Sequence, residues 1–358
     1  MSTPPGKPTI KDVARAAGVS VATVSRVVNG TGSVSPEARE AVGRALAATA
    51  YTASPIARSL AGGRTGLVGL CAHQPTHEYA AGLIAGMLEA CETAGYGVLW
   101  FSPRRPDERR SRRPLETLPD GVIVVSPTIE SEEELAWLDT RRPIVHIEPL
   151  AAATPLVERG ELACVTAANH DGAADATRHL LDLGHRRIGF VTGPTARSSS
   201  VERLAGHAAA LADAGLGLDP SLVVEGNYDL ASGFAAGRHL LALPHPPTAI
   251  FASDDTEAIG VVWAAHEAGR HVPNDLSVIG FDDMPMAEQA SPPLTTMHQP
   301  LRAMGQRAAE MLIAWIEQGE RPVPNRQVLP THLVVRASTR PLIRTEDALP
   351  ELLPPSGR

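Results

Sequence analysis

Residues 9–30 read TIKDVARAAGVSVATVSRVVNG and contain two short helical patterns joined by a tight turn. Apolar residues of the first pattern recur at the spacing of one helix face; they are Ile10, Val13, Ala14 and Ala17. Thr9 is a residue type that caps a helix at its start, and Gly18 is one that ends a helix. The sequence therefore predicts an amphipathic helix that ends at a glycine turn.

A second helix is predicted to begin after Ser20 and to end at Asn29-Gly30. Its inward positions are Val24, Val27 and Val28. Its outward positions are Val21, Ala22, Ser25 and Arg26. A third amphipathic segment follows Ser35, with Pro36 at its first helical position, and closes the core up to about Thr49. Two helices joined by a short glycine-containing turn form a helix-turn-helix, whose second helix enters the DNA major groove.

Several ordered blocks of the chain resemble the LacI/GalR family of bacterial transcriptional regulators. At the N-terminus these are IKDVARAAGVSVATVSRVVNG, VSPEAREAV and ARSLAGGRTGLVGL. Further along they are DLGHRRIGFVTGP, ERLAGH, DDTEAIG, VPNDLSVIGFDDMPMAE, PPLTTMHQP and LPTHLVVRAST. The resemblance covers roughly residues 9–340. It implies a DNA-binding head followed by a periplasmic-binding-protein-like body that binds a small molecule.

The charge is distributed unevenly along the chain, as expected for a DNA-binding head attached to a ligand-binding body. The 358 residues carry a formal net charge of −8. Residues 1–64 contain eight Lys or Arg and three Asp or Glu, a balance of +5, so the remainder carries −13. A basic head on an acidic body is expected when only the head contacts phosphates.

Other composition signals exclude several classes of protein. The three cysteines, Cys71, Cys91 and Cys164, lack metal-ligand spacing and fit reduced thiols. Neither a signal-peptide pattern nor a membrane-length apolar run is present, so a cytoplasmic location is expected and a secreted transport protein is not. A zinc site built on His73 and His77 lacks a third ligand, and no nucleophile elbow or P-loop appears. We expect no enzyme activity, cofactor or metal.

From Gly66 onward, short apolar runs alternate with helical patterns, which predicts parallel sheets wrapped by helices. The expected strands are Leu67–Ala72, Gly97–Phe101, Gly121–Ser126, Ile144–Ile147, Arg187–Thr192, Leu222–Glu225, Ala249–Ala252 and Leu276–Phe281. The expected helices include Tyr79–Gly95, Asn169–Gly184, Val201–Gly215, Ala231–Leu243 and Thr256–Gly269. The expected fold class is an all-α helix-turn-helix head plus an α/β core of two doubly wound parallel-sheet lobes, which the family resemblance implies is periplasmic-binding-protein-like.

The predicted domains are a disordered N-terminus (1–8), the head (9–52), a hinge helix or linker (53–64), the two-lobed body (65–340) and a disordered tail (341–358). The N-lobe spans about 65–165 and 297–328, and the C-lobe about 166–296 and 329–340. By resemblance, the hinge pairs with that of a partner chain and presents Leu60 to the minor groove. The Arg-rich segment 104–113 is expected to be an irregular helix; it is read as a solvated face, with a second nucleic-acid site as the alternative.

Ligands of open α/β sheets bind beyond the carboxyl ends of the strands, which here places an effector in a cleft between the lobes. Polar and aromatic residues follow the predicted strand ends or, by resemblance, match effector-contacting positions. The candidate effector residues are Tyr79, Glu148, Arg197, Ser199, Arg203, Tyr228, Asp254 and Asp282; Asp255 is read mainly as a helix cap or lobe bridge. Carboxylates and an arginine fork suit the hydroxyls of a sugar, polyol or nucleoside.

The candidate DNA contacts divide into base readers and phosphate positioners. The base readers are Val21, Ala22 and Arg26. The phosphate positioners are Thr9, Ser20, Thr23, Ser25, Asn29 and Tyr51. We therefore expect a homodimeric repressor that reads a palindromic operator under the control of a carbohydrate-like effector. Two alternatives stay open: a corepressor-dependent regulator, and a DNA-binding dimer without ligand control.

Overall fold

The computed structural model describes residues 8–29, 32–49, 51, 64–72, 78–101, 118–125 and 142–342. Several expectations fall outside these ranges and are not assessed by the structure. They are the N-terminal segment, the hinge with Leu60, the histidines His73 and His77, the Arg-rich segment 104–113 and the tail from residue 343.

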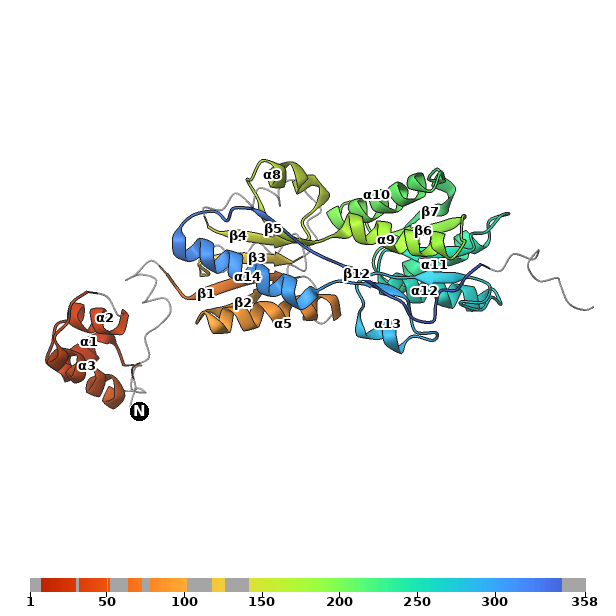
Figure 1. Ribbon diagram of the computed structural model, residues 1–358. Helices are drawn as coiled ribbons and strands as arrows, with labels where there is room; N and C mark the ends of the chain where they lie inside the picture. Colours follow the sequence, from red (N-terminus) through yellow and green to blue (C-terminus); the bar gives the residue numbers. More distant parts are fainter. Residues whose placement is uncertain are drawn as a thin grey trace, which may run out of the picture.

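The head consists of three helices at one end of the molecule (Figure 1). They are α1 (Ile10–Ala17), α2 (Val21–Asn29) and α3 (Pro36–Thr49). Their core is built from small apolar side chains, namely Val13, Ala14, Val24, Val42 and Ala45. Gly18 ends α1 in the left-handed conformation, with φ 66°, which a residue without Cβ adopts readily. The predicted helix-turn-helix is therefore present.

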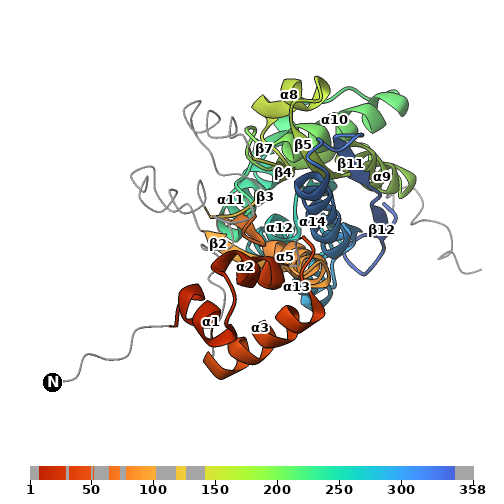
Figure 2. The ribbon, with the colours of Figure 1, turned by 90° about the vertical axis from the view of Figure 1, so that its left-hand side faces the viewer.

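The first lobe is a parallel six-stranded sheet in the order β11-β5-β4-β3-β1-β2. Its strands are β1 (Leu67–Ala72), β2 (Gly97–Phe101), β3 (Gly121–Val125), β4 (Ile144–Ile147), β5 (Ala163–Ala167) and β11 (Arg326–Leu329). Helices α5 (Glu78–Thr93) and α14 (Leu301–Gln318) lie side by side against this sheet (Figure 2). The short helix α8 (Thr154–Glu158) and the 3-10 turn η2 (Ala151–Ala153) connect β4 to β5.

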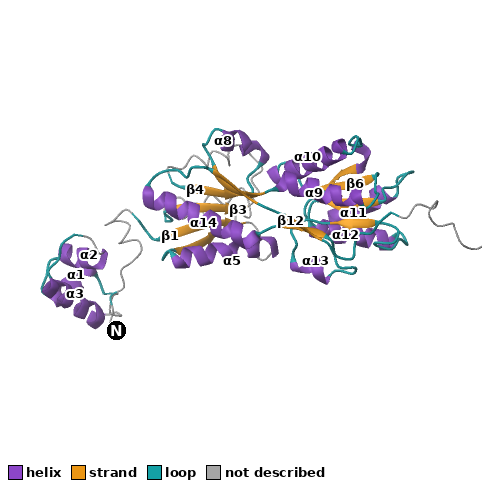
Figure 3. Ribbon diagram, viewed as in Figure 1, coloured by secondary structure: helices purple, strands orange, loops and turns teal. Residues whose placement is uncertain are grey.

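The second lobe is a parallel four-stranded sheet in the order β7-β6-β8-β9. Its strands are β6 (Ile188–Thr192), β7 (Val223–Glu225), β8 (Ala249–Ala252) and β9 (Ser277–Ile279). Its helices are α9 (Asn169–Asp182), α10 (Ser198–Asp213), α11 (Leu230–Leu241) and α12 (Asp255–Glu267), with α13 (Pro285–Gln289) and the 3-10 turn η3 (Pro220–Leu222) beside them. Figure 3 shows helices packed beside the strands of each lobe.

The chain passes between the lobes three times: from β5 into α9, from the segment after β9 into α14, and from β11 into β12. Two short strands of the crossing segments, β10 (Thr296–His298) and β12 (His332–Val334), pair antiparallel. A backbone hydrogen bond of 2.9 Å from Ala151 N–H to the Ala196 carbonyl adds a direct link between the lobes. The lobes are thus connected by three crossings of the chain and by the Ala151–Ala196 hydrogen bond.

Strands β5, β10, β11 and β12 were not expected from the sequence, and the bounds of several expected elements differ by one to three residues. Helix α10 begins at Ser198, three residues before the expected Val201; the prediction overlooked that Ser-Ser-Ser can form a first helical turn. Strand β9 covers only Ser277–Ile279 of the expected Leu276–Phe281, and beyond it the backbone N–H groups of Gly280 and Asp282 donate to the carbonyls of Thr295 and Met297 in the crossing segment. Among the described residues, no helix combines the length and apolar character needed to cross a bilayer.

Candidate functional site

The second helix of the head presents one face to its core and another to solvent. Ser20 caps the helix, with its Oγ accepting a hydrogen bond from Thr23 N–H at 3.1 Å. Val24 is fully buried, whereas Val21 is 41% exposed, and Ala22 and Arg26 are exposed beside it. All three predicted base readers therefore lie on the outer face of α2, free of any role in the core.

The other predicted DNA contacts are distributed around the same helices. Thr9 caps α1: its N–H and Oγ both donate to Asp12 Oδ2, at 3.0 and 2.7 Å. The Thr9 hydroxyl, more than any other group, lowers the pKa of Asp12. Ser25 is half-buried on α2, Asn29 is its last residue, and Tyr51 packs against the head core.

A second set of predicted residues meets between the two lobes around Arg203 of α10. Arg203 is only 2% exposed, and its guanidinium lies 3.8 Å from the centre of the Phe281 ring. Its Nη2 lies 3.4 Å from Asp282 Oδ1, and its Nη1 donates to the Ser253 carbonyl. Arg203 and Asp282, each predicted as an effector contact, therefore form an ion pair with one another.

Asn169 connects this ion pair to the first lobe. Its Oδ1 accepts a hydrogen bond of 2.9 Å from Arg203 Nε, and its Nδ2 donates to both oxygens of Glu148 at 3.1 Å. Glu148 follows β4 of the first sheet, and Ala167 N–H donates to its Oε1 at 2.7 Å. We call Glu148, Asn169, Arg203 and Asp282 the inter-lobe cluster.

Burial changes the protonation of the carboxyl groups in and beside this cluster. Removal from water raises the pKa of Glu148 to about 7 and that of Asp282 to about 6, against the opposing charge of Arg203. Burial and the nearby Asp282 together raise the pKa of Asp254 to about 7. Asp254 also caps α12, its Oδ1 accepting from Glu257 N–H at 2.6 Å.

The two predicted aromatic residues flank the inter-lobe cluster. Burial raises the pKa of Tyr79 well above its ordinary value, and the charges of Glu148 and Asp282 add to this effect. Tyr79 of α5 thus lies within electrostatic reach of carboxyl groups from both lobes. Tyr228 follows β7, and its hydroxyl is 2.6 Å from Ser200 Oγ and 3.3 Å from Ser199 Oγ.

Arg197 stands at the start of α10, where its backbone forms an isolated bridge with Leu150 of the first lobe. Burial lowers its pKa, while Tyr228, Tyr79 and Glu148 act in the opposite direction. The structure thus brings all eight predicted effector residues to the boundary between the lobes. Asp255 instead binds two neighbouring segments of the chain, because it accepts hydrogen bonds from Thr296 Oγ1 at 2.5 Å and from Met284 N–H at 2.8 Å.

Backbone strain and unmatched polar atoms concentrate at this boundary. Within the described ranges, the non-glycine residues with positive φ are Glu148 (50°), Tyr228 (57°), Asp282 (107°) and Asp283 (58°). Buried side-chain atoms without a hydrogen-bond partner include Arg197 Nη1, Ser253 Oγ, Glu257 Oε2 and Gln299 Oε1. Strained residues and unsatisfied polar groups are costly and mark functional sites. Both observations indicate a binding site.

Sequence reasoning missed Asn169 and Gln299, whose Nε2 donates to Asp282. Asn169 follows β5 (ACVTA), a strand that was not expected because its small residues give a weak apolar signal. Had β5 been identified, the rule for strand ends would have selected Asn169. Gln299 lies in a crossing segment, for which that rule has no counterpart.

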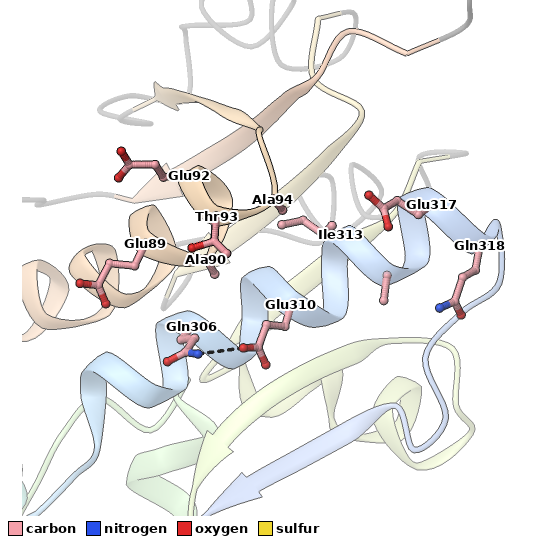
Figure 4. Close-up of a pocket in the computed structure, with 11 residues that line it drawn as sticks. Glu89, Ala90, Glu92, Thr93, Ala94, Gln306, Glu310, Ile313, Glu317 and Gln318 are labelled. Atoms are coloured by element: carbon pink, nitrogen blue, oxygen red, sulfur yellow. Dashed lines mark hydrogen bonds between the residues drawn. The ribbon is translucent and has the colours of Figure 1, made fainter. Parts of the chain in front are cut away.

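A groove of about 700 Å³ opens between α5 and α14 on the first lobe (Figure 4). Its rim is acidic, with Glu89, Glu92, Glu310 and Glu317, and Gln306 Nε2 donates to Glu310 at 2.8 Å. None of the predicted effector residues lines it. In the described part of the chain, no three His, Cys, Asp or Glu side chains are grouped so that they could hold a metal ion.

Comparison with known proteins adds independent information. A profile described as "Bacterial regulatory proteins, lacI family" matches residues 9–54, and one described as "Periplasmic binding protein-like domain" matches residues 177–339. The HTH-type transcriptional regulator CelR of Thermobifida fusca is 35% identical over 340 residues, which cover 93% of this chain and 98% of CelR.

Two solved structures are similar over nearly the whole chain. A complex of the transcriptional regulator CelR with cellobiose has a TM-score of 0.71 at 34% identity, covering 92% of this chain and 99% of that one. The lac repressor dimer bound to operator and the anti-inducer ONPF has a TM-score of 0.77 at 28% identity, covering 94% and 100%.

Proposed function

This chain belongs to the lacI family of bacterial regulatory proteins, and from that premise we propose which of its residues read DNA and which bind the effector. It is a DNA-binding transcriptional regulator with a helix-turn-helix head. The proposal is that it represses transcription as a homodimer in the cytoplasm, without enzyme activity, and releases its operator when a small carbohydrate binds.

Helix α2 enters the major groove, where Arg26 donates hydrogen bonds to a guanine and Val21 and Ala22 contact thymine methyl groups. The exposure of these three side chains supports this assignment. The residues proposed to position the head on phosphates are Thr9, Ser20, Thr23, Ser25, Asn29 and Tyr51. Leu60 of the hinge wedges into the minor groove. Two heads on a two-fold axis read a palindrome, because one head contacts too few bases for tight binding.

The effector binds at the inter-lobe cluster. The single observation that carries this proposal is the network in which Arg203 joins Asp282 and, through Asn169, the Glu148 carboxyl of the other lobe. Such acceptors and donors match the vicinal hydroxyls of a sugar. The remaining proposed contacts are Tyr79, Arg197, Ser199, Tyr228 and Asp254. The similarity to a CelR–cellobiose complex supports a carbohydrate.

A thermal-unfolding screen with mono- and disaccharides, nucleosides and sugar phosphates tests the effector class. A true effector at 100 times its dissociation constant adds about 2.7 kcal/mol to the free energy of unfolding. We expect a neutral sugar to raise the midpoint in wild type and not in Arg203→Ala. An equal shift in both proteins would place the binding site elsewhere, and stabilisation by nucleosides alone would overturn the carbohydrate class.

A further inference from the structure

Glu257 is a buried acid beside the proposed effector site, and one of its two carboxyl oxygens has no hydrogen-bond partner. It lies in the first turn of α12 and is 0% exposed. Burial, reinforced by the neighbouring Asp254, raises the pKa of Glu257 to about 9, so its carboxyl carries a proton at neutral pH. Its Oε2 is among the buried atoms without a hydrogen-bond partner. A buried polar atom in this condition costs free energy that an apolar side chain would not.

The other oxygen of Glu257 holds the backbone of Tyr228. Tyr228 N–H donates to Glu257 Oε1 at 2.9 Å, and Tyr228 has the left-handed φ of 57°. A large side chain in this conformation is strained and persists only when its surroundings hold it there. The hydrogen bond from Glu257 is a contact of that kind.

The chain around Tyr228 is shaped to fit this carboxyl and the tyrosine ring. A Cβ added at Gly226 would lie 2.1 Å from Glu257 Oε1, and one added at Gly193 would lie 2.0 Å from Cζ of Tyr228. Both glycines therefore leave space that Glu257 and the ring occupy. The ring's hydroxyl then reaches Ser200 and Ser199 at the start of α10.

We propose that Glu257 is a positioning residue of the effector site, which fixes Tyr228 in its left-handed conformation so that the ring forms part of the site. This inference rests on the proposed function of the inter-lobe cluster. Glu257 does not contact the effector itself. The unpartnered Oε2 of Glu257 lowers the stability of the protein, whereas its Oε1 fixes the position of the tyrosine ring. Functional sites commonly lose stability in this way.

Two substitutions separate positioning from a merely structural role. Glu257→Met keeps the approximate volume and removes the acceptor, whereas Glu257→Gln retains an acceptor oxygen. Amide hydrogen exchange is measured by mass spectrometry on ligand-free protein, in peptides that span residues 226–229. We expect exchange about tenfold faster in Glu257→Met, the factor that corresponds to one lost hydrogen bond, and wild-type exchange in Glu257→Gln.

Cellobiose serves as the ligand probe. If wild type binds it, its dissociation constant should rise at least tenfold in Glu257→Met and stay within twofold in Glu257→Gln. Glu267→Met, an exposed position on the same helix, is the matched control and should change neither measurement. Unchanged exchange in Glu257→Met, equal effects of Met and Gln, or faster exchange with an unchanged cellobiose constant would each overturn the proposal. Failure of wild type to bind cellobiose would count against that sugar as effector, while the exchange pattern would still decide the role of Glu257.

Discussion

Glu148 shows how a single buried acid links the proposed effector site to protein stability. Its ordinary pKa of 4.5 is raised to about 7 by burial. Between pH 4.5 and about pH 7 the carboxyl of Glu148 has lost its proton in the unfolded chain but keeps it in the folded chain. Stability therefore falls as the pH rises through this window, and the loss is complete above pH 7.

Glu148→Gln cannot ionise, so it should remove that loss. We expect the stability of the variant relative to wild type to increase by about 2 kcal/mol between pH 5 and pH 8, measured by urea unfolding. The exposed Glu320→Gln should follow the wild-type profile. If Glu148→Gln also tracks wild type across this range, Glu148 ionises normally in the folded protein.

Arg26 is the residue-scale test of DNA reading. Arg26→Ala should weaken binding to the operator, selected from a random DNA pool, by about 1–3 kcal/mol, because a bidentate contact with guanine is lost. Binding to unrelated DNA should weaken much less. Fluorescence anisotropy at one fixed salt concentration measures both, and equal losses on both DNAs would show that Arg26 contacts only phosphate.

Helices α5 and α14 approach each other through glycine. A Cβ added at Gly305 would lie 1.8 Å from the Leu83 carbonyl oxygen, and one added at Gly86 would lie 1.8 Å from that of Arg302. Because both obstacles are backbone atoms, no side-chain rotation relieves the contact. The spacing of this helix pair is therefore fixed by two residues that periodicity alone does not distinguish from other small core residues.

Gly305→Ala should force the two helices apart and destabilise the protein by about 1–3 kcal/mol, the usual cost of overpacking. Gly43→Ala is the matched control, since Gly43 lies exposed within α3 and an added Cβ there meets nothing within 4 Å. It should stabilise the head by about 0.5–1 kcal/mol. Thermal unfolding measures the change in stability of both variants. If Gly305→Ala destabilises the protein no more than Gly43→Ala, α5 and α14 can move apart without cost.

At the scale of the molecule, effector and operator are coupled only as far as the effector prefers one arrangement of the lobes over another. Asp282 is 5% exposed, carries a φ of 107° and precedes Asp283. Asp283 in turn contacts His298 of β10 at 3.0 Å and Arg336 at 2.6 Å. A movement of Asp282 would therefore be transmitted to the crossing segments through the adjacent residue, Asp283.

Asp282→Ala should abolish the response of operator affinity to effector. The test is a gel-shift titration with and without the sugar identified by the thermal screen, with circular dichroism to establish that the variant is folded. Asp213→Asn, an exposed change on α10, should retain the wild-type response. A normal response in Asp282→Ala would remove this residue from the effector site.

The sequence by itself determined the helix-turn-helix and the exposed face of α2, because capping, glycine turns and apolar spacing act over a few neighbouring residues. It also located most strands of the two sheets and selected eight residues that the fold gathers at one boundary. Local rules sufficed there, since each candidate follows a strand end or matches a motif.

Only the tertiary structure decided how those residues act together. Asn169 joins Glu148 to Arg203, Gln299 reaches Asp282 from a crossing segment, and Glu257 holds Tyr228. These partners lie between 17 and 34 residues apart in the chain. Their contacts depend on how two sheets and their connections pack, and so do the raised pKa values of the buried acids. The burial of these acids arises where the two lobes meet, and no local pattern encodes it.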